Sequence, residues 1–208
     1  MKLYLFVAAI ALLFSGCTGD YEPIFNGTDL SGWEVKGGDK WYVESGELIG
    51  ESGEGEQNGY LSTVKDYHDF ELQFEFLPEM MHNSSGVFFR TRIEGSEVFG
   101  WKVEIGADEH GTGSIYEQNG RGWLKQISVQ DQSDLKIGKW NSMRIKVVGG
   151  TVSTWLNGEL MVTLSDEKIA SGDGFIAFQI HKGGGVKMKW RKIRIKELDK
   201  LEKVNQYF

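Results

Sequence analysis

Cysteine and proline are nearly absent from this 208-residue chain, which has one cysteine, Cys17, and two prolines. A single cysteine excludes a disulfide framework within the chain, so a folded core must hold together by noncovalent packing. The scarcity of proline, the 28 glycines and the 12% aromatic residues are typical of an ordered, turn-rich β protein. A chain of this length can bury a substantial core, and we expect one domain.

The chain also lacks an apolar run long enough for a stable transmembrane helix. Its run at 3–14 would rise only about 18 Å as a helix, whereas the hydrocarbon core of a bilayer is about 30 Å thick. The run follows Lys2 and precedes small residues, which is the pattern of a cleaved export signal. We therefore exclude this segment from the fold and expect an exported protein.

Cys17 allows a more specific interpretation of the export signal. Two small residues followed by Cys17 resemble a bacterial lipobox, although Phe14 stands where leucine is commoner. We expect a signal peptide over 1–16, lipidation of Cys17 and a tether over 17–23. The protein would then be anchored to a bacterial membrane by lipid and face the periplasm or the cell surface. Ordinary cleavage that leaves a free thiol is the alternative.

Positive charge is in deficit, because the formal net charge is −7. Proteins that bind nucleic acid need Lys and Arg clustered on one face, and we see no such run in the sequence. The sequence therefore predicts neither a nucleic acid nor another polyanion as partner.

Short runs of alternating apolar and polar residues fill the rest of the chain, separated by Gly, Asn, Asp and Ser. This period of two predicts antiparallel sheet, with around a dozen strands and little helix. Tight turns are predicted at 45–46, 149–150 and 157–158; the last is Asn-Gly, which tolerates the positive φ angles of a type I′ turn. The longer predicted strands are 70–77, 86–92, 98–106, 174–181 and 186–197.

The alternation predicts which side chains share a face of their strand. Four strands each have one polar face, and the residues expected on those faces are Glu71, Gln73 and Glu75; Arg90 and Arg92, with Phe88; Lys102 and Glu104; and Gln179 and His181. The opposite faces carry the apolar side chains and predict the core.

Several motifs occur in an order that resembles one known family. They include "FNGTDLSGW", "DFELQFEF", "NSSGVFFR", "GWKVEIG", "GKWNSMRIKVVGG", "GFIAFQIH" and "WRKIRIKEL". The sequence is similar to the domain of unknown function 1080, also called the 3-keto-disaccharide hydrolase domain. The resemblance implies an all-β fold, an antiparallel β-sandwich of the concanavalin A-like jelly-roll type, over 24–200, followed by a tail at 201–208. Glucanases and lectins share that architecture, so the fold alone assigns no chemistry.

The resemblance implies activity on carbohydrates that are oxidised at carbon 3. A ketone there acidifies the hydrogen on carbon 2, so a base can remove it, the glycosidic oxygen on carbon 1 can leave, and water can add back. Such a site needs a base, a donor for the enolate oxygen and an acid for the leaving group. His181 matches the family's "Q-x-H" position and Arg90 the arginine that closes "SGIxxR". Where the family commonly has Glu and then Gln in "GYEVQI", this chain has Lys102 and Glu104.

The candidate catalytic residues follow from those needs. His181 or Glu104 is the candidate base; Arg90, Lys102 or a metal ion would stabilise the enolate; and Glu75 would protonate the leaving oxygen. A divalent ion could be held by Glu75, Glu104 and His181. The candidate substrate-binding residues are Lys102, Gln179, Gln73, Arg92, Trp123, Tyr116 and Asp108.

Each candidate has a simpler interpretation that stays open. Glu104 could form a cross-strand ion pair with Lys102 or Arg90, Glu75 could lie on a solvated face, and His181 could be a surface histidine. His110, in the loop "ADEHGTG" with Asp108 and Glu109, could join a metal or substrate site, although we favour a mobile acidic loop.

The tryptophans also allow two interpretations, because aromatic faces stack on sugar rings but are mainly core residues in sandwiches. We expect Trp101 and Trp155 in the core and Trp123 at the rim of a groove. The alternatives to an enzyme are a non-catalytic carbohydrate-binding lipoprotein and an adhesive surface protein.

Overall fold

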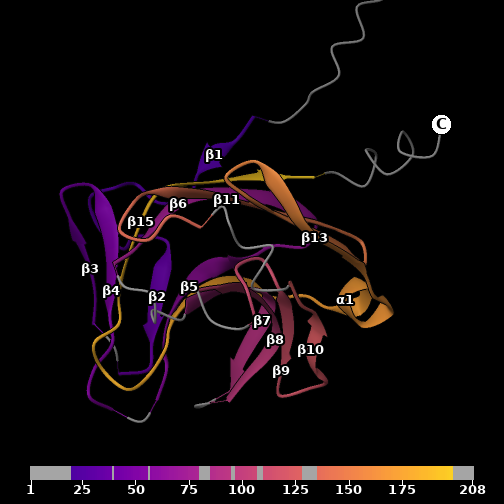
Figure 1. Cartoon of the computed structure of the whole chain (residues 1–208), viewed down its shortest axis with the longest axis horizontal. Helices are drawn as coiled ribbons and strands as arrows, with labels where there is room; N and C mark the ends of the chain where they lie inside the picture. Colours follow the sequence, from indigo (N-terminus) through magenta and orange to yellow (C-terminus); the bar gives the residue numbers. More distant parts are fainter. Residues whose placement is uncertain are drawn as a thin grey trace, which may run out of the picture.

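The computed structural model describes residues 20–38, 40–55, 57–79, 85–94, 97–106, 110–127 and 135–198. Within these residues the chain forms fifteen strands and one short helix, α1 (Glu167–Ser171). The strands form two antiparallel sheets that face each other, and α1 lies at one end of the sandwich (Figure 1). The expected all-β sandwich is therefore confirmed.

We call the two sheets sheet A and sheet B. Sheet A has the order β13 (Glu159–Ser165), β12 (Thr151–Leu156), β11 (Asn141–Val148), β6 (Phe70–Pro78), β15 (Lys187–Glu197), β4 (Glu47–Glu51) and β3 (Lys40–Glu44), with β1 (Glu22–Pro23) beside β15. Sheet B has the order β10 (Gly122–Lys125), β9 (Ile115–Gln118), β8 (Glu97–Ile105), β7 (Ser85–Glu94), β14 (Phe175–Ile180), β5 (Gly59–Asp66) and β2 (Trp33–Lys36).

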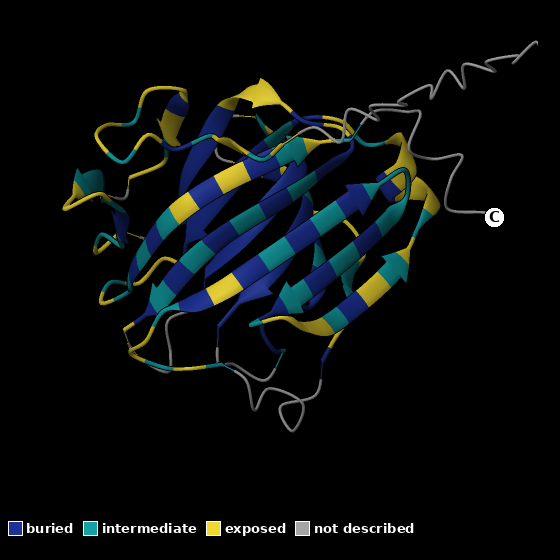
Figure 2. Ribbon diagram, turned by 90° about the horizontal axis from the view of Figure 1, so that it is seen from above, coloured by how far each residue is buried: buried dark blue, intermediate teal, exposed yellow. Residues whose placement is uncertain are grey.

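The core lies between the sheets and is built by the predicted alternation. Phe70, Leu72, Phe74 and Phe76 of β6 are all buried. The ring of Phe74 meets the ring of Phe178 from sheet B edge to face, with centroids 5.4 Å apart. Figure 2, which looks onto sheet A, shows buried residues alternating with more exposed ones along its strands. Each sheet thus buries one face and leaves an outer face that is largely polar.

Two of the three predicted turns form as left-handed pairs, whereas at 149–150 only Gly149 has a positive φ. Ser45 and Gly46 have φ of 53° and 80°, and Asn157 and Gly158 have φ of 51° and 96°. These values suit type I′ turns, whose twist matches that of the flanking strands. The turns join β3 to β4 and β12 to β13, as the sequence predicts.

Two local features differ from the sequence predictions. Glu22 and Pro23, expected in a tether, pair with Ile195 and Arg194 of β15. Trp155, expected in the core, lies on the outer face of sheet A under the guanidinium of Arg144, 3.6 Å from the ring centroid. The reason is that β12 places Val152, Thr154 and Leu156 inward, so the polar Thr154 takes the core position and Trp155 faces out.

Candidate functional site

The outer face of sheet B brings together most of the predicted polar residues. Lys102 of β8 lies opposite Phe88 of β7 and Tyr116 of β9. Glu104 lies opposite Gly86, and Gln179 of β14 also lies opposite Gly86. Trp123 of β10 lies opposite Tyr116. The regular period of β8 and β14 explains why the sequence grouped these side chains correctly.

A buried ion pair lies on this face. Nζ of Lys102 is 2.7 Å from Oε2 of Glu104, and the two side chains are 10% and 1% exposed. Burying one charge away from water is costly unless an opposite charge accompanies it, so each group offsets the burial of the other. Gly86 makes room for it, because a Cβ there would lie 2.6 Å from Cδ of Lys102.

Gln179 adds an unmatched polar atom beside the ion pair. The residue is 2% exposed, and its Oε1 has no hydrogen-bond partner among the described residues. A buried acceptor without a partner costs stability of about 1–3 kcal/mol. A ligand hydroxyl that donates to Oε1 would remove that cost.

Three rings form an aromatic rim at the edge of sheet B: His110, Tyr116 and Trp123. The ring centroids of His110 and Trp123 are 4.1 Å apart, and Tyr116 meets Trp123 edge to face at 4.9 Å. Nζ of Lys102 is 5.7 Å from the ring centroid of Tyr116, so the rim adjoins the ion pair. Nδ1 of His110 is also 2.8 Å from Nε2 of Gln126. The rim offers the kind of surface on which sugar rings stack.

A cavity of about 520 Å³ opens on the same face. Polar groups from several elements line it, and Oδ1 of Asn58 accepts a hydrogen bond of 2.9 Å from the backbone N–H of Lys182. Tyr60 and Val98 belong both to the lining and to a small apolar cluster with Phe88 and Ala177. The lining comprises Lys36, Gly37, Gln57, Asn58, Tyr60, Ile93, Glu97, Val98, Gln118, Asn119 and Lys182. Its volume lies within the range of small-ligand pockets, about 300–1,000 Å³.

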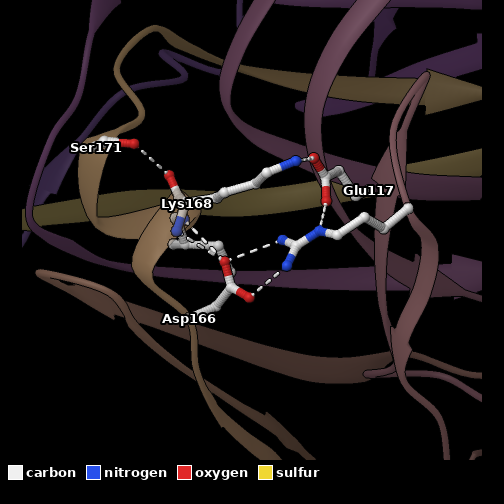
Figure 3. A network of polar contacts seen from close by, with 6 residues as sticks. Glu117, Asp166, Lys168 and Ser171 are labelled. Carbon is white, nitrogen blue, oxygen red and sulfur yellow. Dashed lines mark hydrogen bonds and ion pairs between the residues drawn. The ribbon is translucent and has the colours of Figure 1, made fainter.

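The rim is braced by a polar network at the end of the sandwich (Figure 3). Arg121, in the turn between β9 and β10, donates to both carboxylate oxygens of Asp166 at 2.8 and 3.0 Å and also to Glu117. Lys168 lies 3.5 Å from Glu117. Asp166 caps α1, and the hydrogen bonds from Arg121 hold the pKa of its carboxyl below the usual value. The network fixes the hairpin that carries Tyr116 and Trp123.

Arg90 does not point onto the outer face of sheet B. A bulge between Phe89 and Arg92 and a φ of 48° at Arg90 break the alternation of β7. The guanidinium is fully buried and donates to Asp69 at 2.9 Å. It also donates to the carbonyl oxygens of His68, Gly149 and Ile169. Arg90 thus links the β5–β6 loop, the β11–β12 turn and α1, and the expected placement beside the substrate is corrected.

Glu75 and Gln73 lie on the other sheet. Both face outward from β6 in sheet A, where Glu75 pairs with Arg191 at 2.6 Å and Lys192 at 2.7 Å. Gln73 accepts a hydrogen bond from Arg194 at 2.8 Å. The core therefore separates Glu75 and Gln73 from Glu104. Strand alternation predicts which side of a strand a residue faces, but it does not predict the sheet to which the strand belongs. The expected grouping of Glu75 with Glu104 is therefore wrong.

The expected metal ligands do not come together either, since Glu75 is on sheet A. Within the described residues, no three His, Cys, Asp or Glu side chains are placed to hold a metal ion. Arg92 lies opposite Phe99, in phase with the core side of β8, and pairs at 2.5 Å with the exposed Asp173. This phase turns Arg92 away from the cavity face, contrary to expectation.

His181 follows β14 in the phase of Gln179 and is exposed, with Nδ1 3.2 Å from the carbonyl oxygen of Lys182. Asp108 and Cys17 lie outside the described residues. Among the described residues, no helix is long and apolar enough to cross a bilayer.

The sequence did not point to Tyr60, Asn58 or Lys182, and for His110 it favoured a mobile loop over a site. The sequence could have indicated Tyr60, because the alternation in "GYLS" places Tyr60 and Ser62 on one face of their strand and Leu61 on the other. Nothing local indicated that His110 would stack on Trp123, since that contact depends on how a loop and a separate strand meet.

The two sheets, the polar cavity and the aromatic rim define a lectin-like sandwich with a site on one outer face. The chain belongs to the family of 3-keto-alpha-glucoside-1,2-lyase-like domains, whose sequence profile matches residues 20–196. This membership assigns the chain to a hydrolase-like family. No curated protein sequence gives a significant match.

Several solved structures share the fold. A candidate glycosyl hydrolase from Parabacteroides distasonis ATCC 8503 is 25% identical, with a TM-score of 0.63, over 86% of this chain and 94% of that chain. A second candidate glycosyl hydrolase from the same organism is 20% identical, with a TM-score of 0.65, over 86% and 100% of the two chains. The carbohydrate-binding module CBM66 from Bacillus subtilis is 10% identical, with a TM-score of 0.62, over 80% and 96%.

Proposed function

We propose that the outer face of sheet B binds 3-keto-glycosides and cleaves them by elimination. The observation that carries the proposal is the buried Lys102–Glu104 pair beside the unpartnered Oε1 of Gln179. The family to which the chain belongs, described as 3-keto-alpha-glucoside-1,2-lyase-like, supports the same chemistry. The cavity and the aromatic rim supply a place for the sugar rings.

In this proposal Glu104 is the base and Lys102 the donor to the enolate. The ammonium of Lys102 turns from Glu104 to the ketone oxygen on carbon 3, and the carboxylate of Glu104 takes the proton from carbon 2. The electron pair of that C–H bond passes through the enolate and forms the double bond between carbons 1 and 2 as the bond from carbon 1 to the glycosidic oxygen breaks. The leaving oxygen takes a proton from water. The hydroxide that this leaves adds to carbon 1, and Glu104 returns its proton to carbon 2, so that one water is consumed in a net hydrolysis.

Turnover of a 3-keto-glucoside with a chromogenic leaving group tests the proposal, with the parent glucoside measured beside it. Release from the keto substrate alone is expected. Glu104→Gln removes the base and should lower kcat by about 10²–10⁴-fold, and Lys102→Met should also lower it. Glu75→Gln is the matched control, because it removes a carboxylate that is paired with cations on the other sheet. Full activity in Glu104→Gln would remove Glu104 from the mechanism.

A second candidate function is binding of a carbohydrate without cleavage. The aromatic rim favours this function, because sugar rings can stack on its aromatic side chains without any help from the charged pair. If the chain cleaves neither substrate but oligosaccharides still bind and quench tryptophan fluorescence, this second function replaces the first. A repeat of the assay with a chelator asks whether a divalent ion takes part.

A further inference from the structure

Strand β15 carries a basic stripe on the outer face of sheet A. Met188, Trp190, Ile193 and Ile195 are buried in the core. The other side chains of the strand before Glu197 are all cationic: Lys187, Lys189, Arg191, Lys192, Arg194 and Lys196. The expectation of no clustered Lys and Arg is therefore wrong, because cations that alternate with core residues in "KMKWRKIRIKE" come to one face of a strand.

Carboxylates on this face do not balance the cations. Glu51 is shared by Lys187 at 2.7 Å and Lys40 at 3.7 Å. Glu75 is likewise shared by Arg191 and Lys192. Burial alone would raise the pKa of Glu75, but its two cationic partners outweigh burial and hold that pKa below the usual value. A third carboxylate, Glu47, lies 3.5 Å from Lys189, and Arg194 donates to the amide of Gln73. Three carboxylates thus serve these five cations of β15, which leaves positive charge in excess along the strand in a chain whose formal net charge is −7.

Part of this face is hollowed. A cavity of about 450 Å³ lies over β6, β11 and β15, and its charged lining consists of Arg144, Lys192 and Arg194 with a single carboxylate, Glu75. Arg194 donates to the neutral amide oxygen of Gln73 rather than to an acid. An anionic group of small-molecule size would find cations on several sides of this cavity.

The chain enters the domain on the same face. The hydroxyl of Tyr21 donates to Glu71, and the guanidinium of Arg194 lies 5.1 Å from the centre of the Tyr21 ring. Cys17 precedes Tyr21 by four residues, which can span at most about 14 Å when fully extended. A lipid attached to Cys17 would therefore hold this face, and not the outer face of sheet B, next to the headgroups of the membrane.

We propose that the outer face of sheet A is the membrane-facing surface of a lipoprotein anchored at Cys17, and that the basic stripe of β15 binds anionic phospholipid headgroups. Basic residues close to a tether gain from the surface potential of an anionic leaflet, which extends over a Debye length of about 8 Å. The lipid supplies attachment and the stripe supplies orientation. The cavity of sheet B then opens away from the membrane, whether or not it cleaves keto-glycosides.

The test uses the full chain, expressed in bacteria and reconstituted into nanodiscs of phosphatidylcholine with or without phosphatidylglycerol. Mass spectrometry of the N-terminal peptide must find acyl chains on Cys17. Because Cys17 is the only native cysteine, single reporters can be added at Ser153, on the outer face of sheet A, and at Gln118, on the outer face of sheet B. We expect anionic lipid to slow labelling of S153C by an aqueous thiol reagent and to leave labelling of Q118C unchanged.

Charge reversal separates orientation from attachment. K192E with R194E should restore labelling of S153C on anionic discs although the protein stays attached by lipid, and K36E on the opposite face should not. In vesicle partitioning of a C17S chain, each neutralised cation of the stripe should weaken binding about fivefold. Unacylated Cys17, or equal labelling of the two reporters, would overturn the proposal. So would binding of a soluble acidic polysaccharide to the stripe while S153C stays accessible on anionic discs.

Discussion

The two outer faces use the same residue types in opposite ways. On sheet A the guanidinium of Arg144 lies over the ring of Trp155, and that of Arg191 lies 3.9 Å from the ring centre of Trp140. On sheet B the charged pair is buried at the base of the face, and the rings of the rim contact one another at its edge. Glu, Lys or Arg, and Trp are present on both faces, so composition does not distinguish a binding site from a charged surface.

Burial decides the difference between the faces. The ion pairs of sheet A are partly exposed, so water and salt screen each of them and each contributes little to stability. The Lys102–Glu104 pair is almost fully enclosed, where electrostatic interactions are stronger and an unmatched group such as Oε1 of Gln179 is costly. A charged group acts strongly on a bound sugar only where water does not already hydrate and screen its charge.

The largest predicted effect concerns Arg90, whose buried guanidinium links the β5–β6 loop, the β11–β12 turn and α1. Arg90→Met removes the buried guanidinium that donates to Asp69 and to several carbonyl oxygens, and it should lower the free energy of unfolding by about 3–5 kcal/mol. Arg92→Met, two residues along the same strand, removes an exposed pair and should cost at most about 1 kcal/mol. Urea unfolding measures both variants. Equal losses would contradict the structural role of Arg90.

Gly86→Ala would break the charged pair of sheet B without removing either charge. The added methyl group meets the aliphatic chain of Lys102 at 2.6 Å and must displace it from Glu104. Overpacking of this kind should cost about 1–2 kcal/mol of stability, and turnover of the keto-glucoside should fall. Gly38→Ala is the control, because a Cβ at Gly38 meets nothing within 4 Å. Unchanged turnover in Gly86→Ala would show that the position of Lys102 does not matter.

The sequence alone was enough to predict which side chains share a face of a regular strand. In β8 and β14 an unbroken period of two placed Lys102, Glu104 and Gln179 on one face, and the structure keeps them there. The turns at 45–46 and 157–158 were predictable because each ends in Gly, which adopts positive φ without strain, and Asn157 also tolerates it. Local chemistry determined these features, so local reasoning found them.

The errors arose where a nonlocal contact decides the outcome. Nothing in "VFFRTR" shows that β7 bulges at Arg90, because the bulge depends on carbonyl groups from three distant segments. Glu75 was grouped with Glu104 because alternation cannot show that β6 pairs with β11 and β15 in the other sheet. Trp155 was assigned to the core because it alternates with apolar neighbours. That assignment is wrong because the strand buries Thr154 instead, which donates a hydrogen bond of 2.9 Å to the carbonyl oxygen of Gly113.

A pair of tryptophan variants compares the faces as sugar platforms. Trp123→Ala removes a ring of the aromatic rim and should weaken oligosaccharide binding by about three- to tenfold, in keeping with the loss of one stacking contact. Trp155→Ala removes a ring already covered by Arg144 and should leave affinity unchanged. Isothermal titration with a panel of oligosaccharides distinguishes them. Loss of affinity in Trp155→Ala alone would move the sugar site to sheet A.

The smallest predicted effect is a pH dependence in the network that braces the rim. Hydrogen bonds from Arg121 are the largest cause that lowers the pKa of Asp166 in the folded chain, while its usual value is 3.8. A lowered folded-state pKa means that the carboxylate stabilises the fold at pH values above 3.8, and that this contribution is lost as the pH falls through the folded-state value.

Asp166→Asn keeps a capping side chain but loses the charge, so it should cost about 0.5–1 kcal/mol at pH 6 and progressively less as the pH falls below 3.8. Asp173→Asn, at an exposed pair with Arg92, is the control. Urea midpoints of wild type and variants from pH 6 to pH 3 measure the difference. A gap between wild type and Asp166→Asn that stayed constant over this range would mean that the Asp166 charge does not brace the edge of sheet B. The rim would then owe its position to the packing of Trp123 against His110 and Tyr116 alone.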